Sequence, residues 1–243
     1  MRKAKLFVLA AVAVFIFGST VFAGDYATLN FLGFSKDGRY LAFEEYGVQD
    51  GSGFPYSNVY FGDVAKNSFA SPSISIRLEN ERATESQARA KARLKSAPIL
   101  KKLRIVTGNT GQLTVSRMLT DLSGDTPESG KPQKINFAEI VTSMYRRGDY
   151  ELVLNPVEVK VKACDYNDQP IYKFDLSLKD KGVDKTVSLQ KDGSLPPSRS
   201  CPIDYAMQFV YLYEDKIAVF LNTYYMGFEG PDMRYLVVTG KYK

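Results

Sequence analysis

The sequence predicts an α+β protein that is mostly antiparallel β, with β-meander sheets and one helix near residues 84–96. Three observations lead to this fold class. Short runs of Tyr, Phe and β-branched residues recur along the chain, and aromatic residues make up 13% of it. Turn residues separate neighbouring runs, and only residues 80–104 change to helical spacing. No strand pattern repeats at a steady period of about 40 residues, so a complete β-propeller is not expected.

The N-terminal third is expected to form short antiparallel strands at 29–34, 39–46 and 58–63, and a fourth from about Ser68. An Asp-Gly pair at 37–38 gives the first two strands a tight hairpin turn. In the second strand, Leu41 and Phe43 should share one face, opposite Tyr40 and Ala42. A glycine-rich loop at 47–55 follows.

A helix is expected over residues 84–96. Thr84 and Gln87 fit a capping box at its start, and alanines recur at helical spacing behind them. Pro98 should end this helix or restart a second turn, because proline lacks the backbone N–H that a helix interior needs. Residues 107–134 are rich in Gly, Thr, Ser and Pro and are expected to be mostly loop, with a short strand at 112–119.

The second half is expected to return to strands at 135–141, 150–154, 157–164, 171–178, 186–189, 205–213, 217–223 and 234–239. The run at 217–221 is apolar on both faces, which is typical of a central strand covered on both sides. The two ends of the chain also share a weak strand–loop–strand pattern. We therefore expect 39–46 and 217–223 to lie close together.

Residues 1–23 are typical of a secretory signal peptide. Arg2, Lys3 and Lys5 precede an apolar run at 6–17, and Ala23 closes a small-residue cleavage site. Removing these 23 of the 243 residues leaves 220, which we expect to form one secreted β-rich domain at 24–243 with a loop-rich joint near 107–134. The apolar run is short for a membrane span of about 20 residues, so no integral span should remain after cleavage. Retention of the segment as an anchor is the alternative.

Composition excludes several classes of site. The chain has no histidine, so Ser-His-Asp catalysis and histidine-ligated metals are ruled out, and neither a metal nor a cofactor is predicted. Cys164 and Cys201 are expected to form a disulfide, because an exported chain meets an oxidising compartment. After the signal, 29 basic residues face 27 acidic ones. This near-neutral balance does not favour nucleic acid as a partner.

An acidic and aromatic cleft is the first candidate site. Its members flank the two glycine-rich loops at the chain ends: Glu44, Glu45, Asp50, Tyr56, Glu229, Asp232 and Arg234. Two carboxylates about 5 to 10 Å apart would suffice for glycoside hydrolysis. The alternative interpretation is that these acids are solvated turn residues. The stretch from Asp50 offers too few oxygen ligands for a calcium loop.

A basic patch is the second candidate. It comprises Arg89, Lys91, Arg93, Lys95, Lys101, Lys102 and Arg104. Such a run could contact an anionic partner such as lipid headgroups, a phosphorylated glycan or an acidic protein. The alternative interpretation is a solvated helix face. The apolar side of the helix is mostly alanine, which offers too little apolar surface for membrane insertion.

Two resemblances add to this interpretation. The stretch FSKDGRYLAF with VYFGDV resembles one blade hairpin of periplasmic TolB-like propellers, over residues 31–64 only. Three segments in order resemble a family of bacterial predicted secreted proteins of unknown function: LGFSKDGRYLAFEEYGVQDGSGFPY, then PSRSCP at 197–202 with Asp204 and Tyr205, then GFEGPDMRYLVVTG. This second resemblance implies export in a Gram-negative-type cell and a periplasmic location. It implies no activity.

The functional expectation is therefore an exported, non-catalytic binding or interaction protein, located in the periplasm or secreted. Its partner would be an envelope protein or a glycan. The alternative is a carboxylate-based hydrolase that acts on a cell-envelope glycan, using acids from the first candidate site. Carboxylates that face each other in a cleft would favour the enzyme, and dispersed carboxylates would favour the binding protein.

Overall fold

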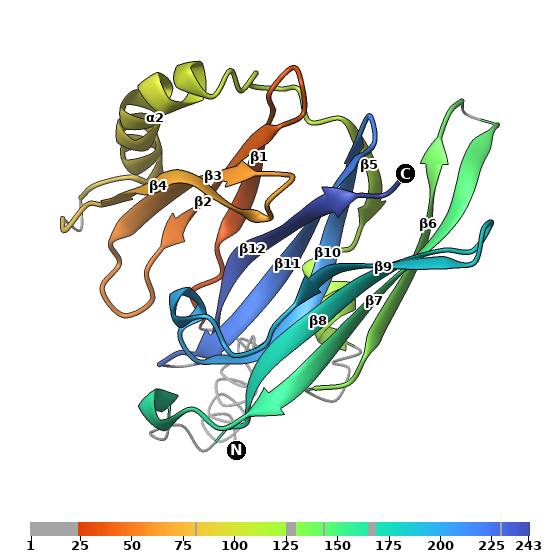
Figure 1. The fold of residues 1–243 in the computed structure, drawn as a ribbon. Coiled ribbons are helices and arrows are strands. Elements are labelled where there is room, and N and C mark those ends of the chain that lie inside the picture. Colours follow the sequence, from red (N-terminus) through yellow and green to blue (C-terminus); the bar gives the residue numbers. More distant parts are fainter. Residues whose placement is uncertain (1–23, 81, 125–129, 143, 165–168, 229) are drawn as a thin grey trace, which may run out of the picture.

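The computed structural model describes residues 24–243 except 81, 125–129, 143, 165–168 and 229. The signal peptide predicted at 1–23 lies outside the described residues. Over the described part, the chain forms three four-stranded antiparallel sheets, as predicted for a mostly antiparallel fold (Figure 1). They are not arranged as a propeller.

The N-terminal sheet is a meander of four consecutive strands: β1 (Thr28–Phe34), β2 (Tyr40–Val48), β3 (Pro55–Asp63) and β4 (Ser68–Arg77). Gly38 has φ +62°, the conformation expected of the glycine in the predicted hairpin turn. Leu41 and Phe43 pack on one face of β2, and Tyr40 and Ala42 on the other. The predicted alternation is therefore confirmed.

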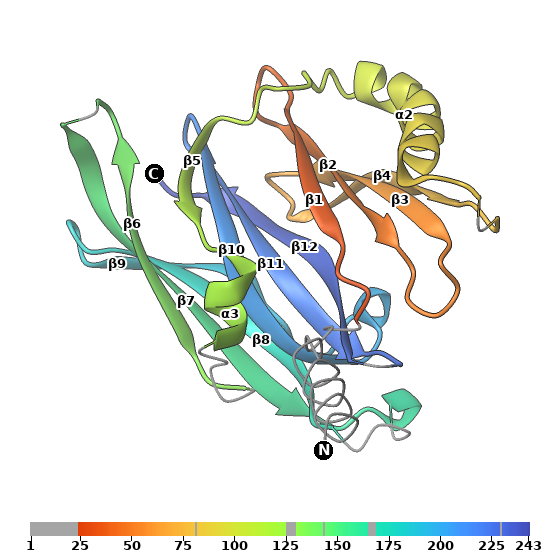
Figure 2. The same ribbon diagram turned by 180° about the vertical axis from the view of Figure 1, so that it is seen from behind.

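Helix α2 (Glu85–Lys102) covers the outer face of this sheet (Figure 2). Thr84 accepts a hydrogen bond from the Gln87 backbone, and the Gln87 side chain caps Thr84 in return, so the predicted capping box is confirmed. Ala88 and Ala92 are fully buried against β2, β3 and β4. Small residues on this stripe let the helix lie close to the sheet.

The central sheet has the order β12-β11-β10-β5. Its strands are β5 (Gln112–Ser116), β10 (Pro202–Tyr213), β11 (Lys216–Met226) and β12 (Pro231–Lys241). Ile217 to Leu221 are all fully buried, which confirms the prediction of a strand covered on both faces. Phe220 contacts Phe43 of β2 with ring centroids 5.4 Å apart. The expected proximity of 39–46 and 217–223 is thus confirmed.

The outer sheet packs on the other face of the central sheet. Its strands, in order, are β6 (Gln133–Ile140), β7 (Arg146–Val159), β8 (Ile171–Asp180) and β9 (Lys185–Lys191). Leu152, Leu154, Phe174 and Leu176 meet Met207, Leu212 and Leu221 in the largest core cluster. The layers therefore run from α2 through the N-terminal sheet and the central sheet to the outer sheet.

Several element boundaries differ from the prediction. Helix α2 continues through Pro98 to Lys102, and a six-residue helix, α3 (Leu119–Gly124), lies in the region expected to be loop. The strands expected at 150–154 and 157–164 are one strand, β7, which ends at Val159. Pro156 is tolerated there because β6 pairs with β7 only as far as Leu154, so beyond that point β7 has one neighbour. Residues 162–164 form the 3-10 turn η1 instead of a strand.

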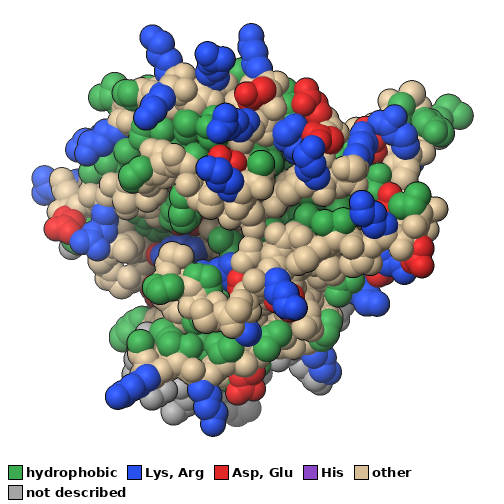
Figure 3. All heavy atoms as spheres, viewed as in Figure 1, with side chains coloured by type: hydrophobic (Ala, Val, Ile, Leu, Met, Phe, Trp, Pro, Cys, Tyr) green, Lys and Arg blue, Asp and Glu red, His purple; other side chains and the backbone are tan. Residues whose placement is uncertain are grey.

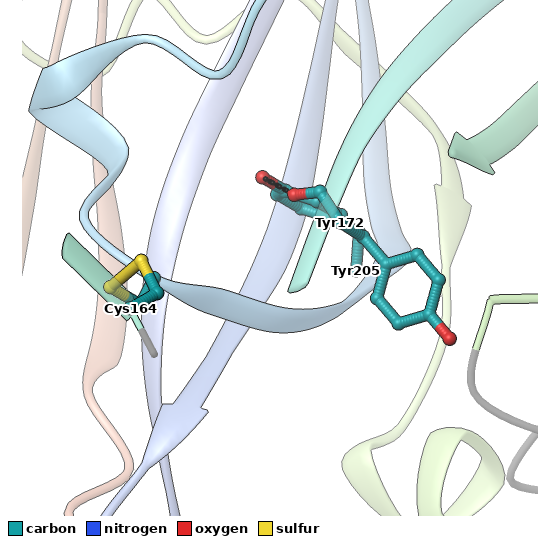
Figure 4. The surroundings of a disulfide bond; sticks show 4 residues. Cys164, Tyr172 and Tyr205 are labelled. Atoms are coloured by element: carbon teal, nitrogen blue, oxygen red, sulfur yellow. Dashed lines mark hydrogen bonds between the residues drawn. A yellow bond between two sulfur atoms is a disulfide. The ribbon is translucent and has the colours of Figure 1, made fainter. Parts of the chain in front are cut away.

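The predicted disulfide is present. Cys164 in η1 and Cys201 just before β10 are bonded, and the described residues contain no free cysteine (Figure 4). Nearby, the Tyr205 hydroxyl donates to the Tyr172 backbone oxygen at 3.1 Å. The bond ties the β7–β8 connection of the outer sheet to the central sheet. A second 3-10 turn, η2 (Pro197–Arg199), stands just before Cys201.

Candidate functional site

The predicted acidic residues do not form one cleft. Glu44 and Glu45 are adjacent in β2, so their side chains point to opposite faces of the N-terminal sheet. Glu44 lies beneath α2 and accepts two hydrogen bonds from the Arg89 guanidinium, each 3.0 Å long. Asn30 and Ser57 also donate to it. Glu44 is therefore a buried structural anion that holds the helix on the sheet.

The other predicted acids are dispersed as well. Asp50 lies in the β2–β3 turn and accepts from the Gly51 backbone at 2.8 Å. Asp232 lies at the start of β12 and accepts from the Asp25 backbone at 3.0 Å. Glu229 lies outside the described residues. Among the described members of the set, no two carboxylates face each other across a cavity in the way a glycosidase would need.

Two other members of the set, Tyr56 and Arg234, meet at a residue that the sequence analysis missed. Asp25 is 5% exposed and accepts a 2.8 Å hydrogen bond from the Tyr56 hydroxyl. The Arg234 guanidinium forms an ion pair with the same carboxylate, and it lies over the Tyr56 ring at 5.0 Å. Asp25 is the second residue after the predicted cleavage site, where no periodic pattern marks it. Only its partners, about 30 and 210 residues away, reveal its role.

A cleft of about 630 Å³ opens where the N-terminal sheet, the edge of the central sheet and the segment before β10 meet. Figure 3 shows the surface hollowed at this place, with basic side chains in the hollow. Tyr60 and Phe69 line one wall, Tyr225 and Arg199 line another, and β12 from Tyr235 to Thr239 runs along the cleft. We call this the β12 cleft.

Glu45 is the only acidic residue among the described residues that line the β12 cleft. It is 2% exposed. Its carboxylate accepts hydrogen bonds from the Tyr60 hydroxyl at 2.9 Å, the Asn58 amide at 3.2 Å and the Tyr235 backbone at 2.9 Å. Burial raises the pKa of Glu45, although these donors and Arg234 oppose the rise. Burial also raises the pKa of Tyr225 to about 12.

Arg199 is the second lining residue that the sequence analysis missed as a site member. It is 9% exposed, forms an ion pair with Asp192 and lies 4.3 Å over the Phe174 ring. It belongs to the PSRSCP segment that carried the family resemblance, and that membership was the available signal. Its charge is fixed in position by Asp192, so it presents an ordered cation to the cleft.

One residue of the predicted basic patch, Arg89, is paired inside the protein. Arg89 is engaged by Glu44 and lies 3.6 Å over the Tyr46 ring. The other six are exposed on α2 or just beyond it: Lys91, Arg93, Lys95, Lys101, Lys102 and Arg104. Binding of an anionic partner by these six stays a prediction. Such binding should weaken strongly between 0.1 M and 1 M salt, because screening shortens from about 10 Å to about 3 Å.

The described residues contain no group of three Asp, Glu, Cys or His side chains close enough to hold a metal ion. Within the same residues, no helix is both long enough and apolar enough to span a bilayer. The groups that line the β12 cleft are mainly aromatic, amide and guanidinium side chains and the backbone of β12.

Comparison with known proteins gives one finding. A family described as "Predicted secreted protein (DUF2259)" matches residues 42–241, which is most of the chain. This match agrees with the second resemblance found in the sequence, and it does not extend the TolB-like one. No curated protein and no solved structure matches the chain.

Proposed function

This chain belongs to that family of predicted secreted proteins, and we propose that it is an exported, non-catalytic binding protein whose ligand occupies the β12 cleft. The cleft itself carries the proposal. At about 630 Å³, it has the size of a small-molecule or short-chain site, and it combines aromatic walls with a few ordered polar groups. Export places the protein where envelope peptides and glycans are available.

The chemistry of Glu45 supports binding over hydrolysis. A carboxylate-based hydrolase needs two acids, one of which exchanges a proton with the substrate. Glu45 stands without a second acid among the described lining residues, and three protein donors occupy its oxygens. It acts as a fixed acceptor that orders Tyr60 and Tyr235 around the cleft.

Phe69 indicates where a ligand makes apolar contact. Its side chain is 61% exposed although it stacks on Tyr60, with ring centroids 6.1 Å apart. An exposed aromatic residue at the mouth of a cleft is typical of a recognition surface. The ligand should therefore offer an apolar group to this wall and polar groups to Asn58, Gln190 and Arg199.

Calorimetric titration of the purified exported protein, with its disulfide intact, tests the proposal. The probes are soluble peptidoglycan fragments and a library of short blocked peptides. We expect saturable binding by at least one probe class. Phe69→Ala should weaken that binding about tenfold, equivalent to about 1.4 kcal/mol, because it removes the aromatic wall.

Tyr145→Ala is the matched control. Tyr145 is 56% exposed, similar to Phe69, but it lies in the β6–β7 turn and does not line the β12 cleft. The control variant should bind like the wild type. Absence of binding by every probe, or equal affinity of the Phe69→Ala variant and the wild type, would overturn the proposal.

A further inference from the structure

We propose that the β12 cleft binds an extended peptide, which adds as a strand to the open edge of β12. This inference rests on the proposed binding function and names the class of ligand. Strand addition is a known mode of peptide recognition, in which main-chain hydrogen bonds supply affinity and alternate side-chain pockets supply specificity.

β12 is an edge strand, paired on one side with β11. Three of its residues direct their N–H groups away from β11. The N–H of Met233 donates to the Asp25 backbone oxygen at 3.0 Å, that of Tyr235 to Glu45 Oε2 at 2.9 Å, and that of Thr239 to Asn67 Oδ1 at 2.9 Å. Glu45 and Asn67 thus replace the carbonyl groups of a neighbouring strand with side-chain oxygens.

Val237 lies between the two positions that these side chains satisfy. Along a strand, the backbone N–H and C=O groups of every second residue point to the same side. The N–H and C=O of Val237 therefore also point away from β11. No hydrogen bond from the described residues reaches either group. Val237 is only half-buried, and it lies in the stretch of β12 that lines the cleft. The edge therefore presents one open donor and one open acceptor at the centre of the cleft.

The chain itself shows that this edge accepts an extended segment. Residues 25–27 lie along the neighbouring part of β12, where Tyr26 and Met233 form a parallel bridge. The Ala27 N–H donates to the Met233 oxygen at 3.0 Å, and Met233 returns a bond to Asp25. An incoming peptide would use the same kind of contact, further along the same strand.

The space between Glu45 and Asn67 sets the length of the peptide. The two side chains accept hydrogen bonds from the N–H groups of Tyr235 and Thr239. These two residues are separated by four strand steps of about 3.3 Å each. A peptide strand would lie about 4.8 Å from β12 and would place three or four residues in this space. The middle residue would exchange hydrogen bonds with Val237.

The walls of the cleft suit the alternating side chains of a strand. One wall, with Tyr60 and Phe69, belongs to the N-terminal sheet. The other, with Tyr225 and Arg199, belongs to β11 and to the segment before β10. Successive peptide side chains would point to the two walls in turn. A glycan lacks the regularly spaced amide N–H and C=O groups that complement Val237, so the geometry favours a peptide.

Amide resonances of the ¹⁵N-labelled full protein provide the test. The probe is a library of acetylated and amidated tetrapeptides, the length that fits between Glu45 and Asn67, with alternating valine or threonine positions. We expect the best binder to shift the Val237 amide resonance and to slow its exchange with solvent at least tenfold. The same peptide, N-methylated at alternate residues, should bind at least tenfold more weakly, because it cannot donate to Val237.

Two variants complete the test. Val237→Pro removes the open N–H and should bind the peptide at least tenfold more weakly than Val237→Ala, which keeps that N–H and shortens only the side chain. Proline is tolerated on edge strands, and urea unfolding checks that the variant is folded. If the proline variant does not fold, the N-methylated peptide decides the question on the wild-type protein.

The outcomes separate the two proposals. Saturable binding of peptidoglycan fragments with an unchanged Val237 amide overturns strand addition and leaves the proposed binding function intact. Peptide binding that N-methylation does not weaken also overturns strand addition. Absence of binding by peptides and glycans alike overturns both.

Discussion

Glu44 and Glu45 are neighbouring residues of the same type, and they have different roles because a strand alternates its side chains. Glu44 meets Arg89 of α2, and Glu45 meets the backbone of β12. Burial would raise the pKa of Glu44, but hydrogen bonds from Arg89, Asn30 and Ser57 hold it below its ordinary value. The carboxylate is therefore ionised in the folded protein and contributes to its stability.

We predict that Glu44→Gln lowers the free energy of unfolding by about 2 kcal/mol at pH 7, because it leaves Arg89 without its buried partner. The pKa of Glu44 is lowered on folding, so its contribution is complete above the ordinary value of 4.5. The contribution is lost as the pH falls through the lowered folded pKa. Urea unfolding of wild type and variant from pH 7 to pH 3 should show their difference shrinking in this range.

Glu79→Gln is the control for this effect. Glu79 pairs with Arg77, but both side chains are more than half exposed. Its substitution should change the free energy of unfolding by less than about 0.5 kcal/mol at every pH. An equal loss in the two variants, or a loss for Glu44→Gln that is unchanged at pH 3, would contradict the prediction.

At the scale of elements, α2 shows how tertiary contacts overcome a local signal. Pro98 is exposed and lies inside the helix, where it removes one backbone hydrogen bond. The helix nevertheless continues, because Ile99 and Leu100 beyond the proline pack against the N-terminal sheet. The burial of these residues offsets the cost of the proline.

We predict that Pro98→Ala raises the free energy of unfolding by about 1–2 kcal/mol, since alanine restores the missing N–H and has the highest helix propensity. Thermal and urea unfolding measure the change. Ala97→Gly, at the exposed neighbouring position, should have the opposite effect and cost about 1 kcal/mol. A destabilised Pro98→Ala variant would show that the proline is required for the path of the chain.

At the scale of the whole molecule, the central sheet takes part in two cores. Phe220 packs with Phe31 and Phe43 of the N-terminal sheet, while Val219 and Leu221 pack with the outer sheet. The disulfide adds a covalent link between the outer and central sheets, worth about 4 kcal/mol for a loop of this length in the chain-entropy model. We therefore propose that residues 24–243 unfold as one unit.

Differential scanning calorimetry tests whether the two cores unfold together. We predict a single transition whose calorimetric and van't Hoff enthalpies agree. Phe220→Ala and Leu152→Ala, one in each core, should each cost about 3–5 kcal/mol and shift that same transition. Val183→Ala, at a 70% exposed position, is the control and should leave it unchanged. Two separate transitions, each sensitive to one core variant, would contradict the prediction.

Features that depend on neighbouring residues could be predicted from the sequence. The β-rich class, the Asp37-Gly38 turn, the capping box at Thr84 and the alternation in β2 follow from local spacing, and the disulfide follows from a count of two cysteines in an exported chain. The candidate site could not be predicted in this way, because its contacts join residues that are far apart in the sequence. Tyr235 meets Glu45 across 190 residues, and Arg234 meets Asp25 across 209. Local periodicity fixes the face toward which a side chain points, whereas the packing of whole sheets decides what it meets there.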